Sequence, residues 1–412
     1  MAVQKNALTN KNVENCRVCL SERTKRLISY GKQPNSFELL KFENQKSYTH
    51  EMSLGYCLDC GFVFITDPIP PEKLYTEYLW PTSLNPASHL GWLFRKINDF
   101  LKDDKQLILD IGSNDGYFLG LFKKGGHDNV LGIEPAKDCA EKAALMGINT
   151  INDYLNEPVI DYIKTYYRLP KVIICRHVIE HVLDLENFIK NIHALMGKDT
   201  LLVLETPSFE MISQKGDFSC IWEQHINYFS LHTLTKILGR YNLSLRRHYI
   251  FPFGGGSLLL FIQLGWKNET DNSSPGLAQD YINKSEANIK ELNTYLKNLK
   301  SKKYKITAFG AGHRSTLLLN ISGGYKYIDY VVDDNKNKEG LFLPGSRLPI
   351  FNTSKLYQEC PPHYCLLTPL NSKKIEKKVI NRHSKFTETG GKFIELFPGN
   401  FRSTQFINYG KE

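Results

Sequence analysis

Short apolar runs alternate with amphipathic stretches over residues 105–265, a pattern typical of parallel strands joined by crossover helices. The apolar runs are rich in Val, Ile and Leu and have the length of single strands: 106–112, 129–134, 171–177, 200–206, 243–251 and 257–264. The pattern therefore predicts an α/β domain built on a parallel sheet.

A second alternation of the same kind follows the polar, turn-rich stretch 266–276. Helical periodicity over residues 278–303 leads into further strand-like runs, at 304–312, 327–335, 364–370 and 390–399. We therefore expect a second α/β domain over residues 277–412, which begins with a long helix.

The first 70 residues differ from both alternations, because they are short-stranded and punctuated by cysteines. Residues 71–104 then form an aromatic and amphipathic connector. The chain is thus predicted to consist of a small head (1–70), a connector (71–104) and two α/β domains.

Two CxxC pairs mark the head: Cys16 with Cys19, and Cys57 with Cys60. A two-residue spacing lets a tight turn point both thiolates at one ion, and two such turns complete a tetrahedral all-sulfur site. Four thiolates saturate Zn²⁺, so the site is predicted to be structural. The alternative is four unrelated cysteines in a small domain.

Composition gives partial information on the cell compartment and the binding partners of the protein. The chain is 42% hydrophobic without a run of eighteen apolar residues, and residues 1–16 hold no apolar stretch that could act as a secretory signal. We expect a cytoplasmic protein without a membrane partner, whose nine cysteines are free thiols or metal ligands. The net charge of +9 suits an anionic metabolite but also a nucleic acid, so charge does not decide between them.

A glycine turn between strand and helix, residues 106–116, is the main candidate for a cofactor site. Gly112 and Gly116 are expected to let the backbone approach a ligand, and Glu134 ends the next strand, where it can accept hydrogen bonds from ribose hydroxyls. The predicted cofactor contacts are Asp110, Gly112, Asn114, Asp115, Gly116, Glu134 and His177.

This turn lacks the glycine spacing of a dinucleotide-binding site, which indicates a different class of ligand. The spacing is not GxGxxG, because Asn114 stands where a second glycine would admit a pyrophosphate. Two acidic residues at the turn suit a cationic, phosphate-free ligand such as S-adenosylmethionine (SAM). A dinucleotide site and an ordinary strand–turn–helix are the alternatives.

Several motifs together resemble the three-domain SAM-dependent sugar C-methyltransferases, which act on nucleotide-activated keto-sugars. They span most of the chain: CRVC (16–19), GKQPNSF (31–37), CLDCGFV (57–63), DIGSNDG (110–116), HVIEHVLD (177–184), EQHINYFS (223–230), FGAGHRSTLLLN (309–320) and YVVDDNKNKEGLFLPGSRLPI (330–350). The resemblance implies a zinc-binding N-terminal domain, a class I methyltransferase Rossmann-like domain and a second, C-terminal Rossmann-like domain.

The resemblance also implies a mechanism. His225 occupies the position of the family's base, which removes the proton beside the sugar ketone so that the enolate carbon attacks the sulfonium methyl. A neutral imidazole suits this role because its pKa lies near working pH. His181 is a second catalytic candidate that either faces the substrate or packs, and His225 itself is otherwise a structural histidine.

Substrate contacts are predicted on the connector, the catalytic loop and the second α/β domain: Trp80, Trp222, Gln224, Tyr228, His313 and Arg314. His313 and Arg314 follow a glycine turn that can present backbone amides to an anion at a helix N-terminus; a purely scaffolding domain is the alternative. The family commonly has tyrosines at the positions of Trp80 and Trp222 and an acidic residue at that of Gln224. The sequence therefore does not decide which substrate atom accepts the methyl group.

The favoured function is methylation at carbon of a nucleotide-linked sugar, without a nucleic acid partner. O- or N-methylation, an RNA-modifying or RNA-binding role, and a binding protein that has lost catalysis are the alternatives. The interspersed acidic residues weigh against RNA. Oligomeric state cannot be read from the sequence.

Overall fold

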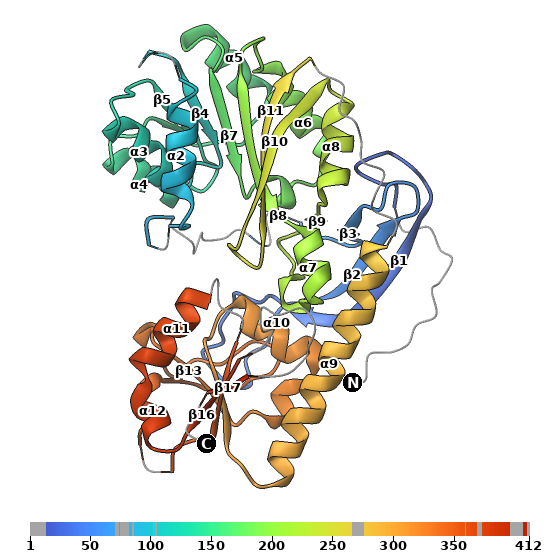
Figure 1. Ribbon diagram of the computed structural model, residues 1–412, viewed down its shortest axis with the longest axis vertical. Coiled ribbons are helices and arrows are strands. Elements are labelled where there is room, and N and C mark those ends of the chain that lie inside the picture. Colours follow the sequence, from blue (N-terminus) through green and yellow to red (C-terminus); the bar gives the residue numbers. More distant parts are fainter. Residues whose placement is uncertain are drawn as a thin grey trace.

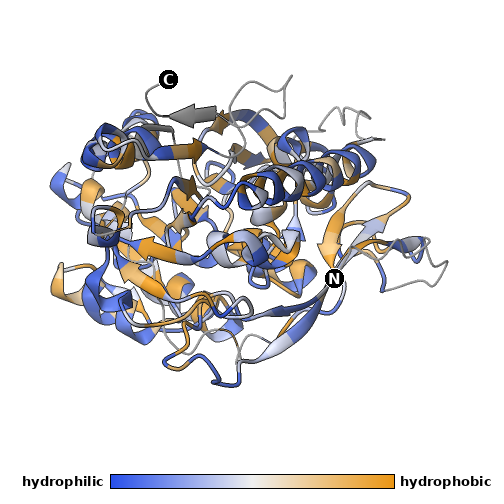
Figure 2. Ribbon diagram, turned by 90° about the horizontal axis from the view of Figure 1, so that it is seen from below, coloured by the Kyte–Doolittle hydropathy of each residue, from blue (hydrophilic) through white to orange (hydrophobic). Residues whose placement is uncertain are grey.

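Three sheets organise the protein in the computed structural model, which describes residues 14–70, 74, 82–84, 86–101, 103, 105–265, 276–358, 360–368, 373–395 and 407–409. A seven-stranded sheet lies at one end of the molecule and a six-stranded sheet at the other, with the small head against their junction (Figure 1). Hydrophobic residues concentrate on the strands inside the molecule, while the surrounding helices carry many hydrophilic ones (Figure 2).

The seven-stranded sheet has the order β10-β11-β8-β7-β4-β5-β6. Its strands are β4 (Ile108–Ile111), β5 (Val130–Ile133), β6 (Thr150–Ile151), β7 (Val172–Arg176), β8 (Leu201–Pro207), β10 (Leu243–Phe251) and β11 (Ser257–Leu264). Its helices are α2 (Leu90–Asn98), α3 (Tyr117–Lys124), α4 (Lys137–Leu145), α5 (Glu157–Tyr166), α6 (Leu185–Ala194) and α8 (Leu231–Gly239).

The strands predicted for this domain all form, but the expectation of a wholly parallel sheet is wrong. β11 runs antiparallel to both β8 and β10. The reason is the short connection 252–256, which can close a hairpin but is too short for the crossover that a parallel pair requires.

The second α/β domain has a six-stranded sheet of order β14-β13-β12-β15-β16-β17, parallel except for β17. Its strands are β12 (Ile306–Phe309), β13 (Tyr330–Asp333), β14 (Ile350–Asn352), β15 (Tyr364–Leu367), β16 (Lys392–Glu395) and β17 (Ile407–Tyr409). Its helices are α9 (Leu277–Ser301), α10 (His313–Ser322), α11 (Lys373–Arg382) and α12 (Ser384–Glu388).

The head is a four-stranded antiparallel sheet that borrows one strand from elsewhere in the chain. β1 (Thr24–Pro34), β2 (Thr49–Cys57) and β3 (Val63–Ile65) are its own. The fourth, β9 (Asn227–Tyr228), ends the segment 221–228, which we call the catalytic loop after its predicted role. Val63 pairs with Tyr228. The head is therefore completed by the same segment that carries His225.

Four thiols of the head converge on one point. The Sγ atoms of Cys16 and Cys60 lie 3.6 Å apart, as do those of Cys19 and Cys57, and all four lie within 4.8 Å of one another. A tetrahedral zinc with bonds of about 2.3 Å separates its sulfurs by about 3.8 Å. The four cysteines thus fit a closed, structural Zn²⁺ site.

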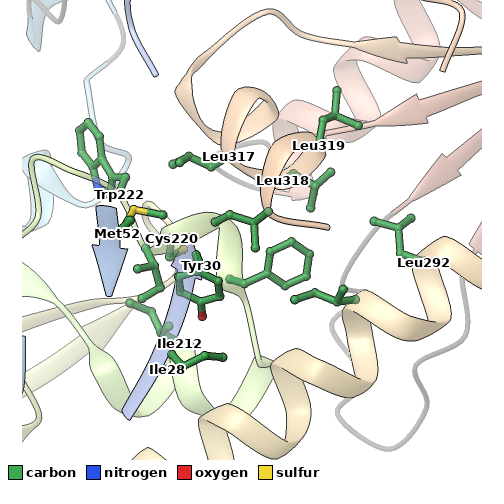
Figure 3. Close-up of a cluster of buried hydrophobic side chains, with 14 of the residues drawn as sticks. Ile28, Tyr30, Met52, Ile212, Cys220, Trp222, Leu292, Leu317, Leu318 and Leu319 are labelled. Atoms are coloured by element: carbon green, nitrogen blue, oxygen red, sulfur yellow. The ribbon is translucent and has the colours of Figure 1, made fainter. Parts of the chain in front are cut away.

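One hydrophobic core joins the head, the catalytic loop and the second α/β domain (Figure 3). Met52 of β2 and Trp222 of the loop belong to it together with Leu317, Leu318 and Leu319 of α10. Three successive leucines point in three directions around a helix, so α10 is buried on several sides. Because each buried leucine contributes about 1.5–3 kcal/mol, this core fixes how the units sit against each other.

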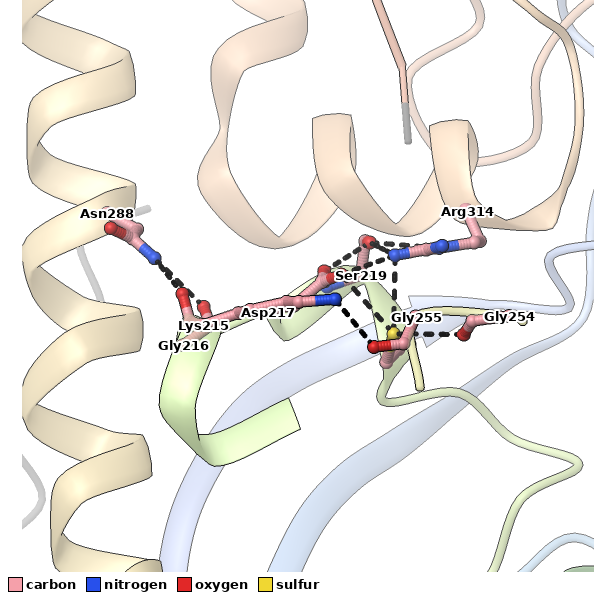
Figure 4. A network of polar contacts seen from close by, with 9 residues as sticks. Lys215, Gly216, Asp217, Ser219, Gly254, Gly255, Asn288 and Arg314 are labelled. Carbon is pink, nitrogen blue, oxygen red and sulfur yellow. Dashed lines mark hydrogen bonds and ion pairs between the residues drawn. The ribbon is translucent and has the colours of Figure 1, made fainter. Parts of the chain in front are cut away.

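A polar network crosses the same junction, between α7 (Phe209–Lys215), the short 3₁₀ helix η3 (Phe218–Cys220), α9 and α10 (Figure 4). The buried Arg314 guanidinium donates to the Asp217 carboxylate and to Ser219 Oγ at 3.0 Å. Asn288 of α9 donates to the carbonyl oxygens of Lys215 and Gly216 at 2.8 and 3.1 Å. The C-terminal domain is thus tied to the methyltransferase-like domain by a buried ion pair.

Asp217→Ala leaves the buried Arg314 guanidinium without its carboxylate, which we expect to lower the free energy of unfolding by about 3–5 kcal/mol. Thermal unfolding followed by circular dichroism tests this. Glu186→Gln removes the exposed ion pair with Lys190 in α6 and serves as the control, with a midpoint near that of the unaltered protein. Equal midpoints for the two variants would contradict a stabilising role for Asp217.

Cys60→Ser should abolish zinc binding and unfold the head, because the metal contributes folding free energy that three remaining ligands cannot supply. Metal analysis of chelator-free protein is expected to give one zinc per chain before the change and well under one after it. Cys139→Ser, at a buried cysteine of α4 outside the cluster, should leave the zinc content unchanged. Well under one zinc per chain in the unaltered protein would refute the site.

Candidate active site

A cavity of about 1460 Å³ lies at the carboxyl ends of β4, β5 and β7 and extends to the start of α10. It brings together most of the residues that the sequence marked as cofactor, catalytic or substrate contacts: Asp110, Gly112, Asn114, Glu134, His177, His181, Trp222, Gln224, His225, His313 and Arg314. Asp115, Gly116 and Tyr228 are not among its lining residues. Trp80 lies outside the described residues.

Glu134 ends β5 with both carboxylate oxygens fixed by backbone amides. Oε2 accepts from the Asn114 N–H at 2.9 Å and Oε1 from the Ala136 N–H at 2.8 Å. Each oxygen keeps a further lone pair, so the carboxylate can also accept hydroxyl groups of a ligand in the cavity. Burial raises the pKa of Glu134, and the two amides oppose this shift.

The β4–α3 turn is organised by its polar side chains. Asn114 adopts a left-handed conformation with φ +56°, and its Oδ1 accepts the Thr82 N–H at 3.0 Å. Asp115 accepts the Ser83 N–H at 2.9 Å. These two side chains therefore hold the short 3₁₀ helix η1 (Thr82–Leu84) over the turn, while Asp110 lies beneath with its pKa raised to about 7 by burial.

The two glycines of the turn adopt a backbone conformation that other residues rarely take. Both have positive φ, +71° at Gly112 and +75° at Gly116. A Cβ on Gly112 would lie 2.4 Å from Val178 Cγ2, and one on Gly116 would lie 3.0 Å from the Ala143 Cβ. The structure thus requires glycine at both positions for backbone conformation and packing, and a close approach of the backbone to a ligand stays a prediction.

The charges along this end of the cavity suit a cationic ligand. Carboxylates predominate among its titratable side chains: Asp110, Glu134, Asp138, Glu141 and Asp153. They outnumber the basic side chains there, Lys137, Arg176 and His177, of which Arg176 is paired with Glu205 at 2.7 Å. A sulfonium and an ammonium are attracted to such a wall, whereas a pyrophosphate is not.

His177 follows β7 with φ +54° and lies between two buried glutamates. Its Nδ1 is 3.2 Å from Glu180 Oε1 and its Nε2 is 3.6 Å from Glu205 Oε1. Burial alone would lower the pKa of His177, but the two carboxylates outweigh it and raise the pKa to about 9. His177 is therefore an imidazolium at neutral pH, and Arg176 and His177 hold the pKa of Glu205 well below its usual range despite burial.

The catalytic loop presents His225 to the cavity beside two other rings. The His225 ring lies 4.4 Å from Trp222 and 4.9 Å from His181. Burial, together with the nearby His181 and His177, holds the pKa of His225 well below 6.5. His225 is thus a neutral imidazole, in contrast to His177.

His181 is oriented by the catalytic loop. Its Nδ1 lies 2.8 Å from the Gln224 carbonyl oxygen. A carbonyl only accepts, so Nδ1 carries the proton and the neutral ring has its lone pair on Nε2. Burial lowers the pKa of His181, although Glu180 opposes the shift.

Residues of the other two domains complete the wall around Trp222. The Trp222 ring lies 4.4 Å from His313 of α10 and 5.1 Å from Phe37 of the head. Phe37 also stacks on His313 at 5.1 Å. Glu223 Oε1 accepts both the N–H and the Oγ–H of Ser36, at 2.8 and 2.7 Å.

Ser36, Phe37 and Glu223 do not line the cavity but support the segment around Trp222, and this role was missed from the sequence. Glu223 and Ser36 are 187 positions apart, and a bond over that separation leaves no local periodicity. The one available signal was the segment 31–37, which contributed to the family resemblance without a role for its side chains.

Two residues predicted to contact the substrate, Arg314 and Tyr228, are bonded to other residues of the protein. The charge of Arg314 is offset by Asp217, so a contact of its guanidinium with a ligand anion stays a prediction. Tyr228 is buried outside the cavity, where its hydroxyl oxygen accepts the Trp222 N–H at 3.1 Å. Tyr228 therefore holds the Trp222 backbone from outside the cavity.

Family models match three consecutive parts of the chain. Residues 16–75 match a family described as "Putative zinc binding domain", residues 89–248 a methyltransferase domain, and residues 254–398 a C-methyltransferase C-terminal domain. The C-methyltransferase NovU of Streptomyces niveus is 24% identical over 409 residues, which cover 94% of this chain and 96% of that protein.

Solved structures match over less of the chain. Magnesium protoporphyrin IX methyltransferase of Synechocystis with bound SAM is 15% identical, covers 43% of this chain and 77% of its own, and has a TM-score of 0.31. A TehB-like SAM-dependent methyltransferase of Corynebacterium glutamicum is 16% identical, covers 45% and 92%, and has a TM-score of 0.33. The fold assignment rests on the sheet order and the family models instead.

The three matches follow one another along the chain, and the relative with a C-methyltransferase name aligns with nearly the whole of it. Part by part, the chain is similar to the three-domain C-methyltransferases, and it is a SAM-dependent methyltransferase with a structural zinc site in its head.

Proposed function

We propose that this enzyme methylates a carbon next to the ketone of a nucleotide-activated deoxysugar, with His225 as the base. The observation that supports this most strongly is a neutral His225 in the same cavity as the β4–α3 turn. A base must be unprotonated before it acts, and burial keeps the pKa of His225 low enough for that across the neutral range.

The cofactor end of the cavity is proposed to be the β4–α3 turn with Asp110, Glu134 and His177. Glu134 would accept ribose hydroxyls on the lone pairs that its two amide bonds leave over. When bound there, SAM supplies an electrophilic methyl group on a sulfonium. The acidic wall supports this assignment because the ligand is cationic at its sulfur.

At the other end, His225 is proposed to take the proton from the carbon beside the ketone. The new imidazolium lies near a negative charge, because donor atoms of Glu180, His181 and His225 lie within 4.8 Å of one another. Proton transfer then leaves an enolate whose carbon forms the bond to the methyl group. Much of the rate would come from holding the two carbons near attack distance.

Trp222 and His313 are proposed to contact the sugar or the nucleobase of the substrate with their rings, since both line the cavity. Gln224 and Trp222 bring no negative charge next to His225, unlike a carboxylate. O- or N-methylation of a related sugar nucleotide is therefore the second candidate. RNA is disfavoured as the substrate because carboxylates predominate at the cofactor end.

We also infer that the reaction takes place in the cytoplasm, which is supported by nine free cysteines, eight of them at least partly buried. Among the described residues, no helix combines the length with the apolar character that crossing a membrane would need.

His225→Ala is expected to cut turnover at least about 100-fold while leaving the binding of S-adenosylhomocysteine unchanged, because the ring takes part in proton transfer only. Turnover is measured as methyl transfer to a panel of nucleoside-diphosphate keto-sugars. In the unaltered enzyme kcat/KM should stay level as pH falls past 6.5 and drop only further into the acid range, because the pKa of His225 is depressed. Near-normal turnover of the variant would remove His225 from the base role.

Calorimetry should show S-adenosylhomocysteine binding first and one nucleoside diphosphate binding to the resulting complex. Thymidine, uridine, guanosine and cytidine diphosphates are titrated in turn. The nucleotide that binds identifies the class of keto-sugar to test for turnover. Cofactor binding without any nucleotide would contradict the sugar-nucleotide proposal and leave the methyltransferase activity standing.

A further inference from the structure

Two imidazoles and a carboxylate meet at the inner wall of the cavity. Glu180 and His181 belong to the short 3₁₀ helix η2 (Ile179–His181), and His225 comes from the catalytic loop. Each offers one ligand atom, and these three atoms lie within 4.8 Å of one another. Two histidines and one carboxylate form a donor set that suits divalent transition-metal ions better than it suits Mg²⁺ or Ca²⁺.

The three side chains are already oriented by neighbours, as metal ligands usually are. His181 donates from Nδ1 to the Gln224 carbonyl at 2.8 Å, which leaves Nε2 as the basic nitrogen. Glu180 Oε2 accepts from Thr206 Oγ1 at 3.1 Å, and Oε1 lies 3.2 Å from His177 Nδ1. Little conformational freedom therefore has to be lost when an ion binds.

Access also favours an ion at this point. His181 and His225 line the cavity, whereas Glu180 is fully buried behind them. An ion there has three protein ligands on one side and cavity space for water on the other, the arrangement of an open rather than a closed site. Glu180 Oε1 also lies 3.2 Å from His177 Nδ1, so a bound ion shares this carboxylate with the His177 ring.

We propose that Glu180, His181 and His225 bind a divalent transition-metal ion such as Ni²⁺, Co²⁺ or Zn²⁺, and that this ion inhibits methyl transfer. The inhibition rests on the function proposed above, because a metal-bound His225 cannot accept the substrate proton. The binding itself does not depend on that function. This second site is separate from the four thiolates of the head, which a structural zinc saturates.

Binding is tested by titrating Ni²⁺ into the full-length, zinc-loaded protein by calorimetry, with zinc release monitored so that exchange at the thiolates is recognised. One Ni²⁺ per chain is expected beyond the retained zinc. His181→Gln and Glu180→Gln should each weaken it at least about tenfold. His193→Gln, at an exposed histidine of α6, is the matched control and should bind as the unaltered protein does.

Absence of this Ni²⁺, or an affinity that neither variant alters, would overturn the metal site. Two variants are used so that a folding defect in one does not decide the result, and melting curves accompany both.

Inhibition is tested with the keto-sugar nucleotide that gives the highest turnover in the panel. Ni²⁺ should suppress methyl transfer at the concentrations at which it binds, and removal of the ion by dilution should restore it. Bound Ni²⁺ with undiminished turnover would overturn the inhibition and, with it, the role of His225 as base. No Ni²⁺ binding in a protein whose turnover needs His225 would overturn only the metal site.

Discussion

The position of His225 depends on contacts that the zinc head makes with the loop around it. Arg17, between the first two zinc ligands, donates to the carbonyl of Ile226 and to Asn227 Oδ1, at 3.3 and 3.0 Å. Ser36 donates twice to Glu223. The catalytic loop contains only the two-residue strand β9 as regular structure, so these bonds and the β3–β9 pairing replace the support that a helix or sheet would give.

This arrangement gives the metal a mechanical role at a distance from the chemistry. Zinc fixes the knuckle that contains Arg17, and Arg17 fixes the residues that follow His225 directly. The aromatic contacts of Trp222 with Phe37 and His313 add support from the head and from the C-terminal domain. The proposed base, His225, is therefore positioned by all three domains.

Buried charges give two histidines of the same cavity different protonation states. His177 has carboxylates on both sides and is charged, whereas His225 has mainly rings beside it and is neutral. Glu180 stands between the two environments, bonded to His177 and within 4.8 Å of a donor atom of His225. The protein thus holds a positive charge at His177 in the same cavity as a neutral His225.

Much of the architecture could be predicted from the sequence, because strands and cysteine knuckles have local signatures. The apolar runs became β4, β5, β7 and β8, and the CxxC pairs converged. The antiparallel β10–β11 pair was mistaken for part of a parallel sheet, although the short connection between the strands was visible. Periodicity shows that a strand exists, but direction follows from the length of its connections.

The site itself was only partly predictable. Residues at the ends of strands, such as Glu134 and His177, could be placed because parallel strands bring their carboxyl ends to one edge. Partners far apart in the chain could not be placed. The pairing of Arg314 with Asp217, 97 positions away, and the packing of Val178 against Gly112 exist only once the chain has folded.

The borrowed strand β9 also sets an order of events during synthesis. The head contains all four zinc ligands by residue 60, so it can capture its metal early, but its sheet is completed only by residues 227 and 228. Until the ribosome has made them, β3 has an unpaired edge, and such an edge is a template for wrong partners. The newly made head therefore carries an edge that a chaperone could cover until β9 is available.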